Sequence, residues 1–467
     1  MTQKITGKNL HFRPVKARSS PYRVLVWMGM LLVAVWLLLQ VRQGVIQSPF
    51  NPTPTPTRTT ASFLLEAQAY FDAGKLDDPN SDLDAIGAYQ NALEIDPANA
   101  QAWAELARIQ TYSSSLTSTD QERLQRLQEA LVSIEKAYAL DPDDSTINAM
   151  RAFVLDWNAS SNLISADARQ DFLTKAEGAA NRAYLLDPQN ALALAFYAEV
   201  LLDQMRLDQA LQYAEQAAQL GPDLMDTHRV YATVLESYGN YRDAIAEYQA
   251  ASDITPNLTF LYLQIGLVYR HLQQFSTALD YFSRAAQVNE QLGIADPLPY
   301  IAIAKTYAQQ GEFFIASRNA EKALLFNPAS ANAYGQLGMI YVQARNYESA
   351  LPALRCASDG CSAADNKTLQ ELAEKYDGQN PTATRLYEEG IDFDIQPLEL
   401  TNLDVAYYYV RYGSVLAYLH SPENNYCERS LELMQLLRQI YPEDPVLMKN
   451  VEDNEATCYS LMDTSTP

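Results

Sequence analysis

A proline recurs every 34 residues in the middle of the chain, at Pro188, Pro222 and Pro256. Alanines keep the same register, five and twelve residues before each proline: Ala183, Ala217 and Ala251, and Ala176, Ala210 and Ala244. A fixed period of roughly 20 to 50 residues indicates a stack of similar supersecondary units, each of which packs only against its neighbours. We therefore expect a long stack that presents surface to partners, rather than a compact catalytic domain.

The residues between the prolines follow the spacing of two helices. With position 1 set three residues after each proline, small residues recur at positions 8, 20 and 27, and large apolar residues at 4, 7, 11 and 24. Positions 4, 7, 8 and 11 share one helix face, and 20, 24 and 27 share a face of the next helix. Small residues let the two helices approach closely, and the proline ends the second helix because it lacks a backbone N–H. One unit fills these positions with Tyr231, Ala232, Leu235, Ala244, Tyr248 and Ala251.

This pattern resembles the tetratricopeptide repeat (TPR) family, in about eight units between Phe63 and Ala357. The resemblance implies an all-α fold, a superhelical solenoid of antiparallel helix pairs with a concave, partner-binding face. We expect the solenoid at residues 62–362, an irregular insertion at 363–401, and a degenerate repeat with a C-terminal capping helix at 402–467. The alternative is an irregular helical bundle in which the alanines coincide by chance.

An apolar run from Val24 to Val41 predicts a transmembrane helix at 24–41. As a helix the run extends about 27 Å, close to the ~30 Å hydrocarbon core of a bilayer. Residues 1–23 contain six Lys or Arg and no acid, which predicts a cytoplasmic tail, a single-pass location in the cytoplasmic (inner) membrane, and repeats on the extracytoplasmic side. A Pro/Thr-rich linker at 42–61 would separate the membrane from the repeats. A cleaved signal peptide and a mitochondrial inner-membrane protein facing the intermembrane space are the alternatives.

Charge and composition exclude several kinds of function. The formal net charge is −23, and the chain has no basic stripe outside the first 23 residues, so we expect no nucleic-acid partner. The four histidines are scattered, and the sequence contains neither a Cys/His zinc motif nor a glycine-rich phosphate loop. We therefore expect no catalysis, no cofactor and no metal.

Four cysteines, all after residue 355, predict two disulfides in an exported domain. Cys427 and Cys458 lie almost equally far from a turn at 441–442, so an antiparallel hairpin brings them together. Cys356 and Cys361 then pair locally at the end of the last regular unit. Four reduced, buried thiols in a reducing compartment are the alternative.

In the TPR family, positions 2, 5, 9, 12 and 13 of the first helix line the concave groove. Position 9 of successive units here holds Arg108, Phe153, Glu199, Thr233, Leu267, Lys305 and Met339. The Lys-then-Asn pairing of the family's carboxylate clamp is absent, so a receptor for chaperone tails is not expected.

The same positions predict a partner site in the C-terminal half. Its apolar residues are Phe260, Leu263, Leu267, Ile301, Met339 and Val342, and its basic edge is Arg229, Arg270, His271 and Lys305. We hypothesise that an amphipathic helix or extended peptide bearing acids lies in this groove. The alternative is that the segment Asp365–Leu400 folds back and fills it.

Together these features predict a membrane-anchored scaffold whose groove binds a peptide or helix of a partner protein and assists complex assembly. The alternatives are an exported protein that binds glycan or cell-wall material through its tyrosines, and the non-catalytic subunit of a membrane enzyme complex. Insertions around residues 112–121 and 158–170 are expected as surface loops or as a second contact site. Asn158, Asn257 and Asn366 match the N-glycosylation pattern.

Overall fold

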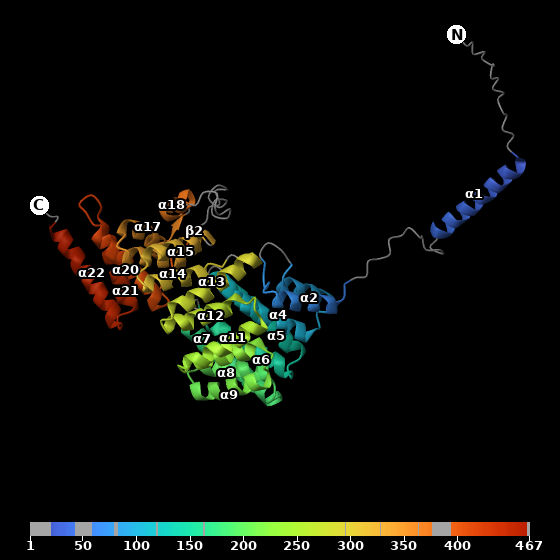
Figure 1. The fold of residues 1–467 in the computed structure, drawn as a ribbon, viewed down its shortest axis with the longest axis horizontal. Coiled ribbons are helices and arrows are strands. Elements are labelled where there is room, and N and C mark those ends of the chain that lie inside the picture. The colour runs from blue at the N-terminus through green and yellow to red at the C-terminus, as the bar shows by residue number, and fades with distance from the viewer. Residues whose placement is uncertain are drawn as a thin grey trace, which may run out of the picture. The chain divides into compact units, whose positions relative to one another are not determined.

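The computed structural model describes residues 20–42, 58–78, 83–117, 120–161, 164–294, 296–326, 328–362, 364–375 and 394–464. The chain divides into two units, Met1–Arg58 and Thr59–Pro467. Helix α1 (Pro21–Arg42) belongs to the first unit, and the other described helices belong to the second (Figure 1). Most of the basic tail at 1–23 and of the linker at 42–61 lies outside the described residues.

Helix α1 forms where the apolar run lies, but the prediction of a transmembrane helix is wrong. In the parts of the chain that the structure describes, no helix combines the length and the apolar character needed to cross a membrane. A single-pass location in the inner membrane, with the repeats on its extracytoplasmic side, is therefore not supported.

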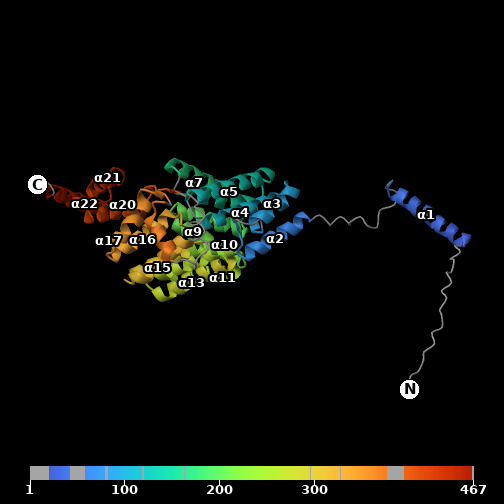
Figure 2. The same cartoon turned by 90° about the horizontal axis from the view of Figure 1, so that it is seen from above.

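The second unit is a solenoid of helix pairs, and the predicted all-α solenoid is confirmed (Figures 1 and 2). The two helices of each pair pack against each other, and the second helix of each pair packs against the first helix of the next. The pairs are α2 (Thr60–Asp72) with α3 (Ala85–Ile95), α4 (Ala100–Ser113) with α5 (Asp120–Leu140), α6 (Ser145–Ala159) with α7 (Ala166–Leu186), α8 (Ala191–Asp203) with α9 (Leu207–Leu220), α10 (Met225–Ser237) with α11 (Tyr241–Ile254), α12 (Thr259–His271) with α13 (Phe275–Leu292), α14 (Leu298–Gln309) with α15 (Phe313–Phe326), and α16 (Ala331–Gln343) with α17 (Tyr347–Ser358). A short 3-10 turn, η1 (Ser114–Leu116), extends α4.

The turn inside a pair has the same backbone conformation in successive units. Met205, Gly239, Gln273, Gly311 and Arg345 all adopt left-handed φ values, between 59° and 87°. Three of these residues carry a side chain, for which this conformation costs about 1 kcal/mol. The packing of the two flanking helices therefore fixes the turn, whether or not a glycine is present.

Small residues hold the two helices of a pair close together. A Cβ on Gly266 would lie 2.4 Å from a ring carbon of Phe282, and one on Gly338 would lie 2.5 Å from Leu354 Cγ. Alanines at positions 20 and 27, such as Ala244, are fully buried. The small residues of the 34-residue pattern are thus packing residues, as the helix-pair interpretation requires.

An irregular region follows α17. The strand β1 (Cys361–Ser362) pairs antiparallel with β2 (Asp394–Ile395), and α18 (Lys367–Lys375) packs on α17. A further pair then forms from α20 (Leu403–Tyr418) and α21 (Tyr426–Ile440), and α22 (Pro445–Thr464) packs against both helices. The helix α22 therefore covers the C-terminal end of the stack.

Both cysteine pairs expected from the sequence lie at disulfide distance. The sulfur atoms of Cys356 and Cys361 are 2.07 Å apart, and those of Cys427 and Cys458 are 2.20 Å apart. The second pair joins α21 to α22 across a sequence separation of 31. A crosslink over a loop of this length stabilises a fold by roughly 3–4 kcal/mol in the chain-entropy model.

The asparagines of the three glycosylation patterns have structural roles. The Asn158 side chain donates to backbone carbonyls of α5 and α6, and that of Asn366 donates to the Tyr334 hydroxyl at 2.7 Å. Asn158 is 2% exposed and Asn366 is fully buried. Neither side-chain amide is accessible in the folded chain.

The third of these asparagines closes the stack on itself. Asn257 Nδ2, in the turn before α12, donates to the carbonyl of Asp72 at the end of α2, at 3.0 Å. Gly74 has a φ of +74°, and a Cβ there would lie 2.5 Å from the Asn257 carbonyl oxygen and 3.0 Å from Leu292. The end of α2 and the turn that follows it therefore lie against the turn before α12 and the end of α13.

Candidate partner-binding groove

The first helices of the pairs face the inside of the closed stack. We call this side the inner face and define it by α4, α6, α8, α10, α12, α14 and α16. Tyr112, at the end of α4, crosses it: its ring stacks on Phe260 of α12 at a centroid distance of 5.6 Å and lies 5.2 Å from Phe153 of α6. Tyr112, Ser113 and Ser114 are buried, so the insertion that begins here is not a surface loop at its start.

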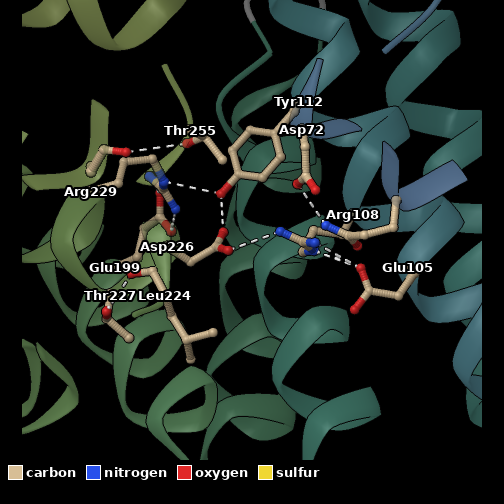
Figure 3. A network of polar contacts seen from close by, with 12 residues as sticks. Asp72, Glu105, Arg108, Tyr112, Glu199, Leu224, Asp226, Thr227, Arg229 and Thr255 are labelled. Carbon is tan, nitrogen blue, oxygen red and sulfur yellow. Dashed lines mark hydrogen bonds and ion pairs between the residues drawn. The ribbon is translucent and has the colours of Figure 1, made fainter. Parts of the chain in front are cut away.

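Buried ion pairs fill the same part of the inner face (Figure 3). Arg229 of α10 binds Glu199 of α8 through two hydrogen bonds, of 2.8 and 2.7 Å, and its Nε donates to the Tyr112 hydroxyl at 3.1 Å. Asp226 of α10 accepts from Arg108 of α4 at 2.9 Å and from the Tyr112 hydroxyl. Both arginines are at most 8% exposed, and each has a carboxylate partner.

These partners compensate the burial of charge. Burial lowers the pKa of Arg229, but Glu199, Tyr112 and Asp226 together raise it by more, so that the pKa ends well above its ordinary value. Burial raises the pKa of Tyr112, which keeps its hydroxyl protonated and able to donate to Asp226. Arg229 therefore presents no free charge to a ligand, and Phe260 is covered by the Tyr112 ring. We call the part of the inner face from α4 to α10 the filled half.

Carboxylates border this network on α6 and α8. Asp156 is 2% exposed, and its Oδ1 has no hydrogen-bond partner among the described residues. Burial, followed by Asp203 and Glu199, raises the pKa of Asp156 well above its ordinary value, and burial and Glu199 raise the pKa of Asp203 to about 6. In the described ranges, no group of three His, Cys, Asp or Glu side chains is placed to hold a metal ion.

The inner face is open beyond α10, where two pockets share Arg270 and Gln309. We call the two together the open groove. The pocket between α10, α11, α12 and α14 is lined by Thr233, Glu236, Ser237, Tyr241, Tyr248, Gln264, Leu267, Arg270, His271 and Gln309. The pocket between α12, α14, α16 and α20 has a volume of about 400 Å³ and is lined by Arg270, Lys305, Ala308, Gln309, Gln336, Met339, Ile340, Gln343, Asp404, Tyr407 and Tyr408.

Two cations in the open groove have no anionic partner among the described residues. Arg270 Nη1 is buried without a hydrogen-bond partner in the described part of the chain, and burial lowers the pKa of Arg270. The guanidinium lies 5.9 Å from the Phe282 ring centroid. Burial, followed by the charge of Arg270, lowers the pKa of Lys305, and Asp404 offsets this only in part. Unlike the arginines of the filled half, these two cations form no ion pair with a described carboxylate.

Known proteins share the repeat found here. The family model of the tetratricopeptide repeat matches residues 331–357, which are α16 and most of α17. Residues 331–357 therefore form a tetratricopeptide repeat. It is 26% identical over 146 residues to BBSome complex member BBS4 of Mus musculus, and 27% identical over 157 residues to Tetratricopeptide repeat protein 6 of Homo sapiens. The matches cover 31% and 32% of this chain, and 27% and 30% of those proteins, so the chain spans less than a third of either relative.

Solved structures give a broader likeness. The crystal structure of the APC/C hetero-tetramer Cut9-Hcn1 matches 71% of this chain and 55% of that chain, with a TM-score of 0.46 and 14% sequence identity. The structure of pilF from Pseudomonas aeruginosa matches 54% of this chain and 98% of that chain, with a TM-score of 0.35 and 18% identity.

Residues at the TPR groove positions line both halves of the inner face. Arg108 and Glu199 occupy position 9 of their units and Arg229 occupies position 5, so the filled half is built from groove positions. Sequence reasoning missed the pairing of Glu199 with Arg229, although an acid at position 9 followed by an arginine at position 5 of the next unit was a readable signal. It also missed Asp404 and Tyr407 of α20, because the irregular region hides the register of that helix.

The remaining predicted residues lie around the open groove. Leu263 is half-buried against the core between the two halves, and Val342 packs on the core formed with α20. Ile301 lines a separate pocket together with residues 394–402, which are the described end of the segment expected to fill the groove. Leu398 N donates to the Ala357 carbonyl at 2.9 Å and holds that end beside α17. Residues 376–393 of the segment lie outside the described residues.

Proposed function

We propose that this TPR-containing protein is an interaction scaffold, and that its open groove holds a peptide or helical segment of a partner protein. One observation carries the proposal: the inner face is filled by the chain's own side chains as far as α10, but from α12 to α20 it is hollow. Leu267 and Met339 offer apolar contact there, beside glutamine amides and two cations. Such a mixture suits a peptide or an amphipathic helix bound in a groove.

A role in complex assembly agrees with what one relative is named for. The Mus musculus protein that is similar to this chain over 146 residues is named as a member of the BBSome complex. The alternative of glycan binding through tyrosines has less support, because the largest buried side chains include Tyr112, Tyr248, Tyr262 and Tyr334. Rings enclosed in the core cannot stack on a sugar.

Site-specific crosslinking tests the proposal. A photoreactive residue in place of Met339 should crosslink a partner protein in cells, whereas the same residue at Gln287, on the exposed face of α13, should not. Mass spectrometry of the adduct should locate the contact in one segment of the partner. A synthetic peptide of that segment should then bind the purified chain and compete with the crosslink.

Three results would count against the proposal. They are equal capture from both positions, contacts scattered over the captured protein, and a peptide that does not bind. A crosslink from position 339 to another part of the same chain would support the internal occupant instead.

A further inference from the structure

The two halves of the inner face differ in how their cations are paired. In the filled half, the buried Arg229 and Arg108 each face a carboxylate of the chain, within 3 Å. In the open groove, the half-buried Arg270 and Lys305 line one pocket, and Arg270 Nη1 is buried without a hydrogen-bond partner among the described residues. Because buried charges in folded proteins are normally paired, the described part of the open groove lacks an anion.

The acids that the structure describes near the pocket do not supply this anion. Asp404, at the edge of the pocket on α20, influences Lys305 but forms no ion pair with it. Glu236, in the neighbouring pocket, accepts a hydrogen bond from the Tyr248 hydroxyl at 3.0 Å. His271 lies in that same pocket, with its ring 4.7 Å from the ring of Tyr241.

The pocket holds the donors that a carboxylate needs. A guanidinium presents its N–H groups as a fork that matches the two oxygens of a carboxylate, and here Nη1 is left without an acceptor. The side-chain amides of Gln309 and Gln343 line the same space. Leu267 lies in one pocket and Met339 in the other, with Arg270 common to both, so apolar contacts flank the cations along the groove.

We propose that Arg270 and Lys305 form a subsite for carboxylates of a partner protein, and that the bound segment carries glutamate or aspartate between two apolar residues. The inference rests on the proposed function, since it names the chemistry of the segment held in the open groove. It differs from the carboxylate clamp expected of TPR receptors, whose residues are absent here. The charge of the bound acids replaces the missing counter-ion of the two cations.

The test compares one pair of variants with a matched pair. R270Q with K305Q removes the two cations of the groove, and R182Q with K175Q removes two exposed cations of α7. The first probe is the synthetic peptide from the partner segment captured at position 339. We expect the groove variant to weaken its binding by at least about tenfold, because each charged hydrogen bond contributes on the order of tenfold. The α7 variant should bind as the unaltered chain does.

A second probe does not depend on the partner. A short blocked peptide with glutamates between two leucines should protect Lys305 from acetylation, whereas its glutamine counterpart and inorganic phosphate should not. Protection by phosphate to the same degree would identify a general anion site and overturn the proposal for partner carboxylates.

The outcomes separate the inference from the function on which it rests. If the captured segment binds the groove variant and the unaltered chain equally, the carboxylate subsite is overturned while the binding groove stands. If nothing is captured at position 339, the proposed function itself fails. Circular dichroism of both variants excludes unfolding as the cause of a loss.

Discussion

The filled half and the open groove are built from the same repeat positions, yet they have opposite electrostatic character. In the filled half, cations and carboxylates from α4, α8 and α10 neutralise one another, with Tyr112 between them. In the open groove, Arg270 and Lys305 have no described counter-ion. From this comparison we infer that the filled half closes the stack and that the open groove receives a ligand. Only cations without a counter-ion are stabilised by an anion that a partner brings.

Breaking the ion pair of the filled half should have the largest effect on stability. Glu199→Gln leaves Arg229 buried without a carboxylate, and removal of one partner of a buried pair costs about 3–5 kcal/mol. Urea unfolding followed by circular dichroism measures the loss. The double variant E199L with R229M replaces the pair by apolar side chains and should recover most of the stability. A loss below about 1 kcal/mol for E199Q would show that the pair does not hold the filled half together.

The contact that closes the stack, between Gly74 and Asn257, is the second feature to test by mutation. Gly74→Ala places a Cβ 2.5 Å from the backbone oxygen of Asn257, at a φ of +74°. Gly239→Ala is the matched control, because its φ is +87° but nothing lies within 4 Å of the added Cβ. We expect G74A to lose roughly 1–3 kcal/mol more than G239A. Hydrogen exchange should show the extra loss in α2 and α3; equal protection in the two variants would mean that the first pair does not depend on the contact with α12.

The local sequence pattern predicts much of this architecture, and there is a physical reason why it does not predict the rest. The register of Pro188, Pro222 and Pro256 predicts the helix pairs because each unit is fixed by contacts within about 40 residues. The filled half could not be predicted as a network, because Arg108 and Asp226 are 118 residues apart and meet only when the stack closes. The sequence therefore placed Arg229, Arg270 and Lys305 together as basic groove residues. In the structure, Glu199 neutralises Arg229, whereas Arg270 and Lys305 have no described counter-ion.

Removing charge from the open groove should change the free energy of unfolding in the opposite direction from E199Q. Arg270→Gln and Lys305→Gln each remove a partly buried cation that lacks a counter-ion, so neither variant leaves a new unpaired charge. We expect the stability of the unliganded chain to stay within about 1 kcal/mol, with a shift toward higher stability. Urea midpoints, compared with those of R182Q and K175Q on α7, measure the difference. A loss of several kcal/mol would mean that the two cations are structural and that their anion is already present in the chain.

The pH dependence of stability should differ in sign between the halves, with the smallest effects of the series. In the filled half, burial raises the pKa of Asp203 from 3.8 to about 6, with Glu199 contributing to the rise and Arg169 opposing it. The folded chain therefore keeps a proton that the unfolded chain releases, so the contribution of Asp203 to stability is full below about pH 4 and is lost as the pH rises through 6. Asp203→Asn should flatten this fall, whereas Asp171→Asn on the exposed face of α7 should leave it in place.

Lys305 should produce the reverse dependence at the alkaline end. Its pKa in the folded chain is lowered from 10.5, so the unfolded chain binds the proton more tightly and stability rises as the pH approaches 10.5 from below. K305Q should remove this rise, and the acidic peptide that carries glutamates between leucines should diminish it by restoring the charged form. Urea midpoints across the two pH ranges measure both slopes. If stability changed with pH in the same direction in both ranges, the proposed electrostatic difference between the filled half and the open groove would be wrong.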